Sequence, residues 1–316
     1  MNRAIAAALA AVLLIAGSTA QRAGADNSPV IRIVTLPIDQ TADVFDAQDE
    51  GFFKQAGLKV VVTTLESGPA IIGAVTGGAA DIGDANPGSV AEARERGILV
   101  RYVAPAGLHL SSVPVDLLMV GANSPIRSAR DLAGKTIAVN ALGALPNVAT
   151  DVWITQKGID IAQVHFVELS FPAMGAALTS GRVDAAAMTE PFITSSKTGT
   201  RLLADVFDAI APRFIVSGWF ASDAWIKAHH DEAMHFQAAM RRAHAWANAH
   251  HAESAAILVR NTKILPEVAQ SMTRVQFGST LDPGLIQPVI AAFAKYGGLA
   301  RPLPATDLVW SPTAQP

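Results

Sequence analysis

Two similar stretches constrain the fold of this chain more than any other feature of its sequence. The first reads AVTGGAADIGDANP over residues 74–87, and the second reads ALTSGRVDAAAMTEP over residues 177–191. Gly78 aligns with Gly181, and Asp81 aligns with Asp184, at a spacing of 103 positions. Solenoid repeats recur every ~20–50 residues, whereas ~100 residues is the size of a small domain. The duplication therefore predicts two similar halves.

Each copy carries the same order of local signals. A helix is expected to end at the glycine, which can adopt the left-handed conformation that stops a helix. A turn with the aspartate follows, and then small apolar residues typical of a buried parallel strand. Asn86-Pro87 follows one strand and Thr189-Glu190-Pro191 the other. Because ligands of open α/β sheets bind just beyond the carboxyl ends of strands, we expect a small-molecule cleft between the halves.

The remaining sequence alternates between strand and helix patterns. Strands are expected over residues 30–36, 59–64, 98–104, 113–120, 135–140, 164–169, 201–203 and 214–221, with helices between them. Helices are expected over residues 223–251, 254–260, 266–272 and 283–296, and a polar tail after residue 302. This pattern predicts an α/β protein with two lobes, each with a mostly parallel sheet flanked by helices. We assign residues 26–112 and 213–316 to lobe 1 and residues 113–212 to lobe 2, with crossings near residues 105–115 and 205–215.

The first 25 residues read as a secretory signal peptide. Arg3 precedes a short apolar run over residues 4–16, and Ala23-Gly24-Ala25 offers a small-residue cleavage site. The run is shorter than the ~20 residues that a membrane-spanning helix needs. We expect cleavage after Ala25, with Ala20 as the alternative position, and export to the periplasm. An uncleaved membrane anchor is the competing interpretation.

Charge and cysteine content narrow the possible partners. The net charge is −3 and becomes −5 without residues 1–25, because that segment holds two arginines and no acid. A mildly acidic protein lacks the basic surface that nucleic-acid binding requires. The chain has no cysteine, which excludes a disulfide framework and a lipid-anchoring cysteine. We expect a periplasmic monomer that binds no nucleic acid.

Several short motifs together resemble a known family. They are Glu50-Gly51-Phe52-Phe53 with Gly57-Leu58, residues 78–83, Ser124-Pro125 with residues 131–135, and residues 181–185 with Glu190-Pro191. In this order and spacing, the chain resembles the substrate-binding proteins of ABC importers in the nitrate, sulfonate, taurine and thiamine-pyrimidine-precursor group. The resemblance spans residues 30 to about 260. It implies a type II periplasmic binding protein fold, a hinge motion that closes two lobes on a ligand, and delivery to a membrane permease driven by a separate ATPase.

The candidate ligand-binding residues lie in turns at strand ends. Turn residues and helix N-termini from both lobes would meet in a closing cleft, where free N–H groups favour anions or carbonyl oxygens. Trp219 on the returning strand is added because an aromatic ring suits an apolar ligand. The predicted contact residues are Pro37, Ile38, Asp39, Ser67, Gly68, Pro69, Asn86, Pro87, Leu142, Gly143, Leu145, Thr189, Glu190 and Trp219.

The sequence leaves the identity of the ligand open. No arginine or lysine occurs in these turns, so a dehydrated anion such as nitrate or a sulfonate would have few partners. The apolar residues there favour a ligand with an apolar or aromatic body, such as a pyrimidine or another aromatic nitrogen compound. Glu190, if ionised, would favour a ligand N–H group or cation. Family membership nonetheless keeps sulfonates, taurine and nitrate among the candidates.

Other function classes receive less support from the residues. Six of the eight histidines fall within residues 229–251, and none of these is three or four positions from another, so we expect no metal site and no cofactor. His109 lies near the first crossing and could reach the cleft, although a position in the core or on the surface is the simpler interpretation. We find no catalytic motif and predict no enzyme. The alternatives are a ligand sensor for a receptor kinase and, less favoured, a periplasmic enzyme on the same fold.

Overall fold

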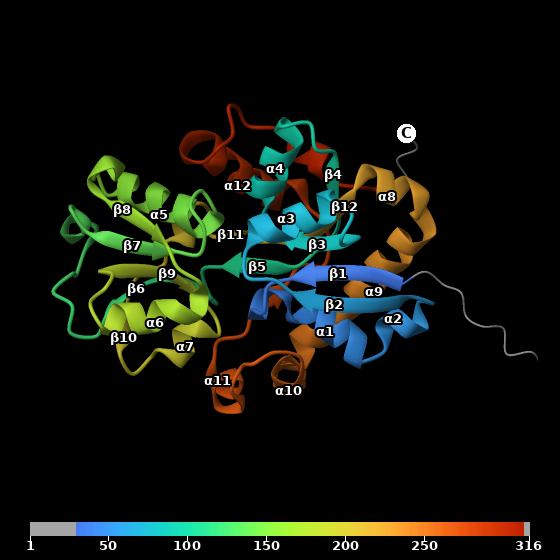
Figure 1. The fold of residues 1–316 in the computed structure, drawn as a ribbon, viewed down its shortest axis with the longest axis horizontal. Coiled ribbons are helices and arrows are strands. Elements are labelled where there is room, and N and C mark those ends of the chain that lie inside the picture. Colours follow the sequence, from blue (N-terminus) through green and yellow to red (C-terminus); the bar gives the residue numbers. More distant parts are fainter. Residues whose placement is uncertain (1–29, 313–316) are drawn as a thin grey trace, which may run out of the picture.

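Two five-stranded sheets lie on either side of a smaller three-stranded sheet (Figure 1). This computed structural model describes residues 30–312, so the predicted signal peptide lies outside the described residues. Figure 1 shows the arrowheads of β1 and β3 pointing toward those of β7 and β8. Within residues 30–312, none of the helices has the length and apolar character needed to cross a bilayer.

The first sheet has the strand order β2-β1-β3-β12-β4. β1 is parallel to β2 and β3, whereas β12 is antiparallel to β3 and β4. The returning strand therefore enters this sheet between two strands of the opposite direction. The bounds are β1 (Val30–Thr35), β2 (Lys59–Thr64), β3 (Ile82–Ala85), β4 (Val100–Pro105) and β12 (Gly218–Ser222).

The second sheet repeats this arrangement, with the order β10-β6-β9-β7-β8. β7 is parallel to β8 and β9, and β6 is antiparallel to β9 and β10. When the first sheet is followed from β2 and the second from β8, each has three mutually parallel strands, then one antiparallel strand, and then an edge strand. The bounds are β6 (Asp116–Gly121), β7 (Thr136–Val139), β8 (His165–Glu168), β9 (Ala185–Thr189) and β10 (Thr200–Ala204). The predicted α/β class with mostly parallel sheets is confirmed.

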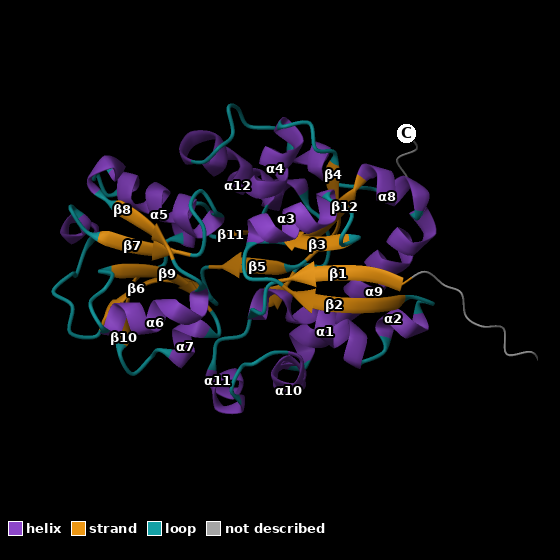
Figure 2. Ribbon diagram, viewed as in Figure 1, coloured by secondary structure: helices purple, strands orange, loops and turns teal. Residues whose placement is uncertain are grey.

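Helices flank both sheets (Figure 2). The α-helices are α1 (Ala42–Asp49), α2 (Phe52–Gln55), α3 (Gly68–Thr76), α4 (Pro87–Glu95), α5 (Leu145–Gln156), α6 (Phe171–Thr179), α7 (Phe192–Ser195), α8 (Asp223–Ala228), α9 (His230–Ala249), α10 (His251–Asn261), α11 (Pro266–Ser271) and α12 (Pro283–Tyr296). Short 3-10 helices are η1 (Asp39–Thr41), η2 (Ala129–Leu132), η3 (Ile161–Gln163), η4 (Phe207–Ala209) and η5 (Ala305–Leu308). α9 packs against α1 and β4, whereas α12 contacts both α4 and α5 and so touches the helices of both sheets.

The duplicated turn has the same geometry in both copies. Gly78 and Gly181 have φ angles of 75° and 71°, the left-handed conformation predicted for a helix stop. The Asp81 carboxylate accepts a hydrogen bond from the backbone N–H of Arg32 in β1 at 2.7 Å. The Asp184 carboxylate likewise accepts one from the backbone N–H of Thr136, at the start of β7, at 2.9 Å. Each aspartate thus ties the turn to the neighbouring parallel strand.

A three-stranded sheet lies at the two crossings between the large sheets. It has the order β11-β5-β13, formed by β5 (Gly107–Leu110), β11 (Arg213–Ile215) and β13 (Gln276–Phe277). The single strand predicted over residues 214–221 is therefore wrong. It divides into β11 and β12 because β11 pairs with β5, whereas β12 pairs with β3 and β4.

Two further helix and tail predictions need correction. The helix predicted over residues 223–251 divides at His229, whose φ of −129° and ψ of 45° are not helical, and α9 ends at Ala249. The segment after residue 302 is no polar tail along its described length. It contains η5, and Trp310 is buried there with its backbone N–H donated to the Tyr102 carbonyl at 2.9 Å.

Replacing glycine by alanine should have opposite effects on stability in the duplicated turn and inside a helix. Gly181→Ala places a side chain at a φ of 71° with no steric contact within 4 Å, so backbone strain alone should cost about 1–2 kcal/mol. Gly73→Ala, in the exposed middle of α3, should instead stabilise by about 0.5–1 kcal/mol because alanine favours the helix. Urea unfolding of both variants measures the difference. Equal effects at the two glycines would contradict the assigned helix stop.

Candidate functional site

A cavity of about 150 Å³ lies between the two large sheets. On a scale where one water needs ~10–15 Å³, this is room for a small organic molecule. Its walls come from the segments that follow β1, β2, β3, β7 and β8, from the start of β6 and from the second crossing. The lining residues are Leu36, Ile38, Gln40, Gly68, Pro69, Asp84, Ala85, Asn86, Ser89, Glu92, Asp116, Asn140, Ala141, Leu142, Gly143, Ala144, Leu145, Pro146, Phe171, Phe207, Val216 and Ser217.

Four helices begin at this cavity, and all four have proline in the first turn. They are α3, α4, α5 and α6, whose first residues or caps line the cavity. Asn86 caps α4, because its Oδ1 accepts the Ser89 N–H at 3.0 Å. The positive ends of these helices favour ligand oxygens with partial negative charge.

Asp84 is the most unusual polar group of the cavity. It lies on β3, is 4% exposed, and its Oδ2 has no hydrogen-bond partner among the described residues. Ser217 Oγ and Asn140 Oδ1, which line the same cavity, also lack partners there. Burial raises the pKa of Asp84 well above its ordinary value, and the nearby Asp43 charge adds to this effect. An unpartnered buried carboxyl is costly, so this atom marks a place where a ligand donor would stabilise the protein.

Asp116 is a second buried carboxyl of the cavity. It begins β6, and its Oδ2 accepts a hydrogen bond from the Gln40 side-chain amide of η1. This bond joins a loop of the first sheet to a strand of the second. Burial raises the pKa of Asp116 to about 8, and the charges of Asp205 and Glu190 act in the same direction.

The cavity carries acids but no basic side chain. Asp84, Asp116 and Glu92 line it, and no lysine, arginine or histidine is among its lining residues within the described chain. Ionising a carboxyl of pKa about 8 at pH 7 costs about 1.4 kcal/mol. A positive charge 4 Å away contributes about 4 kcal/mol at an effective dielectric constant of 20. A cation placed about 4 Å from Asp116 would therefore favour its ionised form.

Half of the predicted contact residues line this cavity. They come from all four turns predicted at strand ends and from both sides of the cavity. They are Ile38, Gly68, Pro69, Asn86, Leu142, Gly143 and Leu145. The turn after β7 supplies three of them, as its position in the sequence predicts.

The other predicted residues lie beside the cavity or in the core. Pro37, Ser67 and Pro87 are sequence neighbours of lining residues but are not in its wall. The remaining four are buried, and protein groups satisfy their polar atoms. Asp39 accepts from Arg274 Nε and from the Val275 N–H, Thr189 donates to the Val115 carbonyl, Glu190 accepts twice from Thr194, and Trp219 donates to Asp43.

The placement of Trp219 and Glu190 corrects the expected role of these two side chains. Trp219 is fully buried within the first sheet, because β12 is a central strand whose side chains face helices. Glu190 is 4% exposed and caps the short helix α7 through the Thr194 N–H at 3.0 Å. Both side chains are held by the protein and do not face the cavity.

Sequence reasoning missed the acids and amides of the cavity. Asp84 offered a signal, because a charged residue stands inside a predicted buried strand where the second copy of the duplication has Ala187. Asp116 likewise begins a strand that is otherwise apolar. Gln40 directly follows Asp39, which is one of the predicted contact residues. Nothing in the sequence marks Ser217, because only the return of the chain from β11 to β12 brings it to the cavity.

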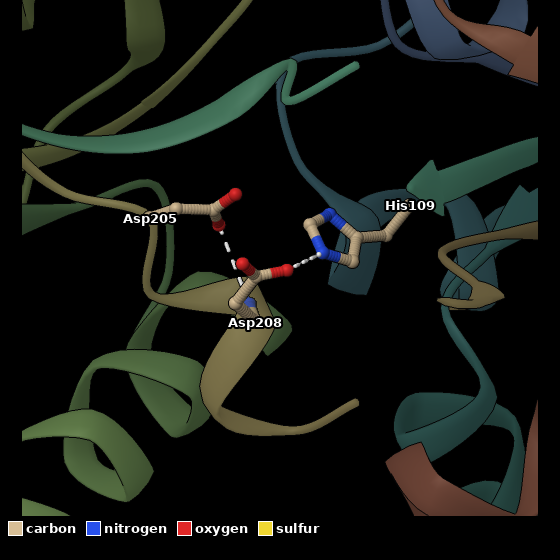
Figure 3. A group of neighbouring side chains, drawn as sticks. All are labelled: His109, Asp205 and Asp208. Carbon is tan, nitrogen blue, oxygen red and sulfur yellow. Dashed lines mark hydrogen bonds and ion pairs between the residues drawn. The ribbon is translucent and has the colours of Figure 1, made fainter. Parts of the chain in front are cut away.

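A separate cluster joins the two crossings beside the cavity. His109 on β5 is fully buried, and its Nε2 lies 2.8 Å from an Asp208 carboxylate oxygen (Figure 3). Asp205 accepts the Asp208 N–H at 3.3 Å, and one atom of each of the three side chains lies within 4.8 Å of the others. His109 does not line the cavity. We interpret this cluster as a tie that fixes the crossing at β5 to the crossing at η4.

Comparison with known proteins places this geometry in context. A family model described as NMT1/THI5 like matches residues 39–254, which is about two-thirds of the chain. No curated protein has a sequence similar enough to be matched with this chain.

Solved structures share the fold at low sequence identity. A ligand-binding component of an ABC-type import system from Staphylococcus aureus, with zinc bound, has a TM-score of 0.77 and 17% identity, covering 90% of this chain and 97% of its own. The alkanesulfonate-binding protein SsuA from Xanthomonas axonopodis pv. citri, bound to MOPS, has a TM-score of 0.75 and 19% identity, covering 90% and 99%. The desulfurization enzyme DSZB has a TM-score of 0.66 and 17% identity, covering 89% and 96%.

The raised pKa of Asp116 predicts how stability depends on pH. A carboxyl whose pKa is higher in the folded state binds its proton more tightly there, so its contribution is complete below about pH 4 and is lost as the pH rises through about 8. Asp116→Asn keeps the neutral shape and removes the titration. The free energy of unfolding of the unliganded protein should fall between pH 5 and pH 8, and the fall should be smaller in the variant by up to about 1.4 kcal/mol per pH unit.

Urea titrations at pH 5, 6, 7 and 8 measure this difference. Asp231→Asn, at a side chain that is 81% exposed, is the matched control and should keep the wild-type slope. An unchanged slope in Asp116→Asn would show that Asp116 is ionised in the unliganded protein.

Proposed function

Because this chain belongs to the NMT1/THI5-like family, which its sequence motifs predict, we propose that it is a solute-binding protein that captures a small organic molecule between its two sheets. Its fold is that of periplasmic binding proteins. The observation that carries the proposal is the cavity where the carboxyl ends of both sheets meet, lined by Asp84 on one side and Asp116 on the other. Such a position is where open α/β sheets bind their ligands.

Contacts across the cavity suggest how the protein would hold a ligand. The loop after β1 reaches the second sheet, where Gln40 donates to Asp116 and the Asp39 N–H donates to the Glu190 carbonyl at 3.4 Å. Ile38 packs in one apolar cluster with Phe171 and Met188. We interpret this arrangement as a closed form. Binding would shift the population from an open form, in which these contacts are broken, to the closed one.

The crossings are the natural hinge of this motion. We propose that residues 26–112 with 213–316, and residues 113–212, move as two lobes about β5 and β11. Backbone rotation at these strands would change the cavity without disturbing either large sheet. α12 contacts α4 and α5, so its packing on one of them would have to slide during opening.

Family membership also supports a transport role. We propose that residues 1–25 direct export to the periplasm and that the liganded monomer docks on a membrane permease with a separate ATPase. The import-system component from Staphylococcus aureus and the SsuA proteins support this assignment by their fold. A ligand sensor for a receptor kinase would use the same cavity, and the partner distinguishes the two roles.

Catalysis is a second candidate because buried acids with raised pKa values are frequent at active sites. DSZB shares the fold and is an enzyme. The cavity-lining residues include no histidine, and the chain has no cysteine, so neither a Ser–His nor a Cys–His pair occurs in that set. We therefore propose binding without turnover. Conversion of a bound compound, followed by mass spectrometry, would decide for an enzyme.

Filling the cavity should abolish ligand binding without unfolding the protein. Leu142 lines the cavity and is 56% exposed, so Leu142→Trp adds volume at the cavity mouth without disturbing the core. A library of sulfonates, nitrate, pyrimidines, aromatic acids and amines would be screened by thermal shift. A ligand at 100 times its Kd adds about 2.7 kcal/mol, which is a shift of a few degrees. The variant should lose at least tenfold in affinity for any compound that stabilises the wild type.

The matched control is Leu202→Trp on β10, which is 52% exposed and does not line the cavity. It should bind as the wild type does, and both variants should keep the unliganded melting temperature. A ligand that binds both variants equally would place the binding site elsewhere. A wild type that responds to no compound in the library would reject the proposed function.

A further inference from the structure

The unpartnered polar atoms of the cavity are all oxygens, which restricts the ligand. Asp84 Oδ2, Asn140 Oδ1 and Ser217 Oγ lack hydrogen-bond partners among the described residues, and all three side chains line the cavity. An ionised carboxylate and an amide oxygen only accept hydrogen bonds, whereas a protonated carboxyl and the Ser217 hydroxyl can also donate. A ligand with N–H donors could hydrogen-bond to all three atoms, whereas a ligand with acceptors only would leave the Asn140 amide oxygen without a hydrogen bond.

Asp84 has no cationic partner among residues 30–312. Burial and the like charge of Asp43 raise its pKa, the nearby Ser217 side chain acts in the opposite direction, and no basic group among the described residues contributes. Two neighbouring donors are bound to other acceptors, whereas the Ser217 hydroxyl lies beside Asp84. Tyr102 donates its hydroxyl to the Ala85 carbonyl at 2.8 Å, and Trp219 donates its indole N–H to Asp43 at 2.9 Å. The Asp84 side chain therefore lines the cavity, and no positive charge among the described residues would compensate the carboxylate if it ionised.

Asp116 adds a second acid to the same cavity. The Gln40 amide donates to it, but the charged groups around it are Asp205 and Glu190, both of which are acids. Carboxyl groups from both sheets therefore line the cavity, and a ligand cation would favour their ionised forms. An anionic ligand would meet two or three acids and no basic side chain of the cavity wall.

We propose that the ligand carries a positively charged nitrogen whose N–H groups bind the Asp84 carboxylate, with Asp116 contributing to the attraction. This inference rests on the proposed function, because it names the class of solute for the same cavity. The rest of the ligand is apolar or aromatic, since Leu36, Leu145, Phe171 and Phe207 form the remaining wall. Phenylalanine rings also favour a cation near their faces.

The helix N-termini at the cavity do not reverse this conclusion. Each helix end acts as about half a positive charge and is strongest within its first turn. At the N-terminus of α4, the Asn86 side chain already accepts a hydrogen bond from one of the free backbone N–H groups, that of Ser89. A ligand with both a cationic nitrogen and an acceptor oxygen would use the acids and the helix ends together. An acceptor group alone would leave Asp84 unpartnered.

Probes matched in shape but not in charge test the proposal. Benzylamine and benzamidine are cations at pH 7.5, benzyl alcohol and benzamide are their neutral counterparts, and benzoate and benzenesulfonate are anions. Taurine and isethionate form a smaller pair that differs only in ammonium against hydroxyl. Isothermal titration calorimetry with the full-length mature protein should give at least tenfold tighter binding for the cation within each matched set that binds.

Two substitutions test whether Asp84 causes the preference for cationic probes. Asp84→Asn keeps the shape and removes the charge, so it should lose at least tenfold in affinity for the cationic probe and little for the neutral one. Asp151→Asn is the control, because Asp151 is also a buried acid, on α5, but does not line the cavity. The unliganded melting temperature of each variant reports whether it folds, and Ser217→Ala provides a milder change at the same place.

The outcomes separate this inference from the proposed function. Selective binding of cations that depends on Asp84 supports both. Binding of benzenesulfonate or isethionate without binding of the cations overturns the ligand class and leaves the solute-binding function standing. Cation binding that is unchanged in folded Asp84→Asn also overturns the inference. Failure of every probe, together with failure of the wider thermal-shift library, rejects both.

Discussion

The turn that occurs twice in this chain fixes the geometry on which the cavity depends. In each copy a left-handed glycine stops a helix, and an aspartate accepts the backbone N–H of the neighbouring parallel strand. The next strand then starts in register with that neighbour and runs toward the centre of the molecule. Because both sheets are built in this way, the carboxyl ends of β3 and β9 point at the region between the sheets, and the loops beyond β1, β3 and β7 can surround one cavity.

The cavity balances two opposing effects. Apolar walls lower the local dielectric constant, which makes a buried carboxyl costly when it is charged and raises its pKa. The same low dielectric constant strengthens its interaction with a ligand of opposite charge. The buried Asp84 and Asp116 therefore make the unliganded protein less stable as the pH rises, and under the proposed function the same acids would favour a ligand of opposite charge. Low intrinsic stability at the cavity and specificity for a solute have the same physical origin.

The elements between the sheets connect the two sides of the cavity. β5 and β11 pair with each other, and His109 is bound to Asp208 where the two crossings meet. On the other side of the cavity, Gln40 and the Asp39 backbone contact the second sheet. Arg274 holds Asp39 from the segment before β13, with its Nε 2.7 Å from the carboxylate. The buried contacts of η1 therefore link the C-terminal segment to the cavity wall.

The sequence by itself determined the two similar halves, the parallel strands, the helix stops at Gly78 and Gly181, and the turns that supply seven cavity residues. These features follow from local signals, namely left-handed glycines, proline at helix starts and the periodicity of apolar residues. Only the tertiary structure decided that residues 214–221 divide between two sheets, that Trp219 and Glu190 face protein groups, and that Asp84, Asp116 and Ser217 meet at one cavity. These positions depend on pairing between strands far apart in the chain, and no local pattern specifies which distant strand a segment will join.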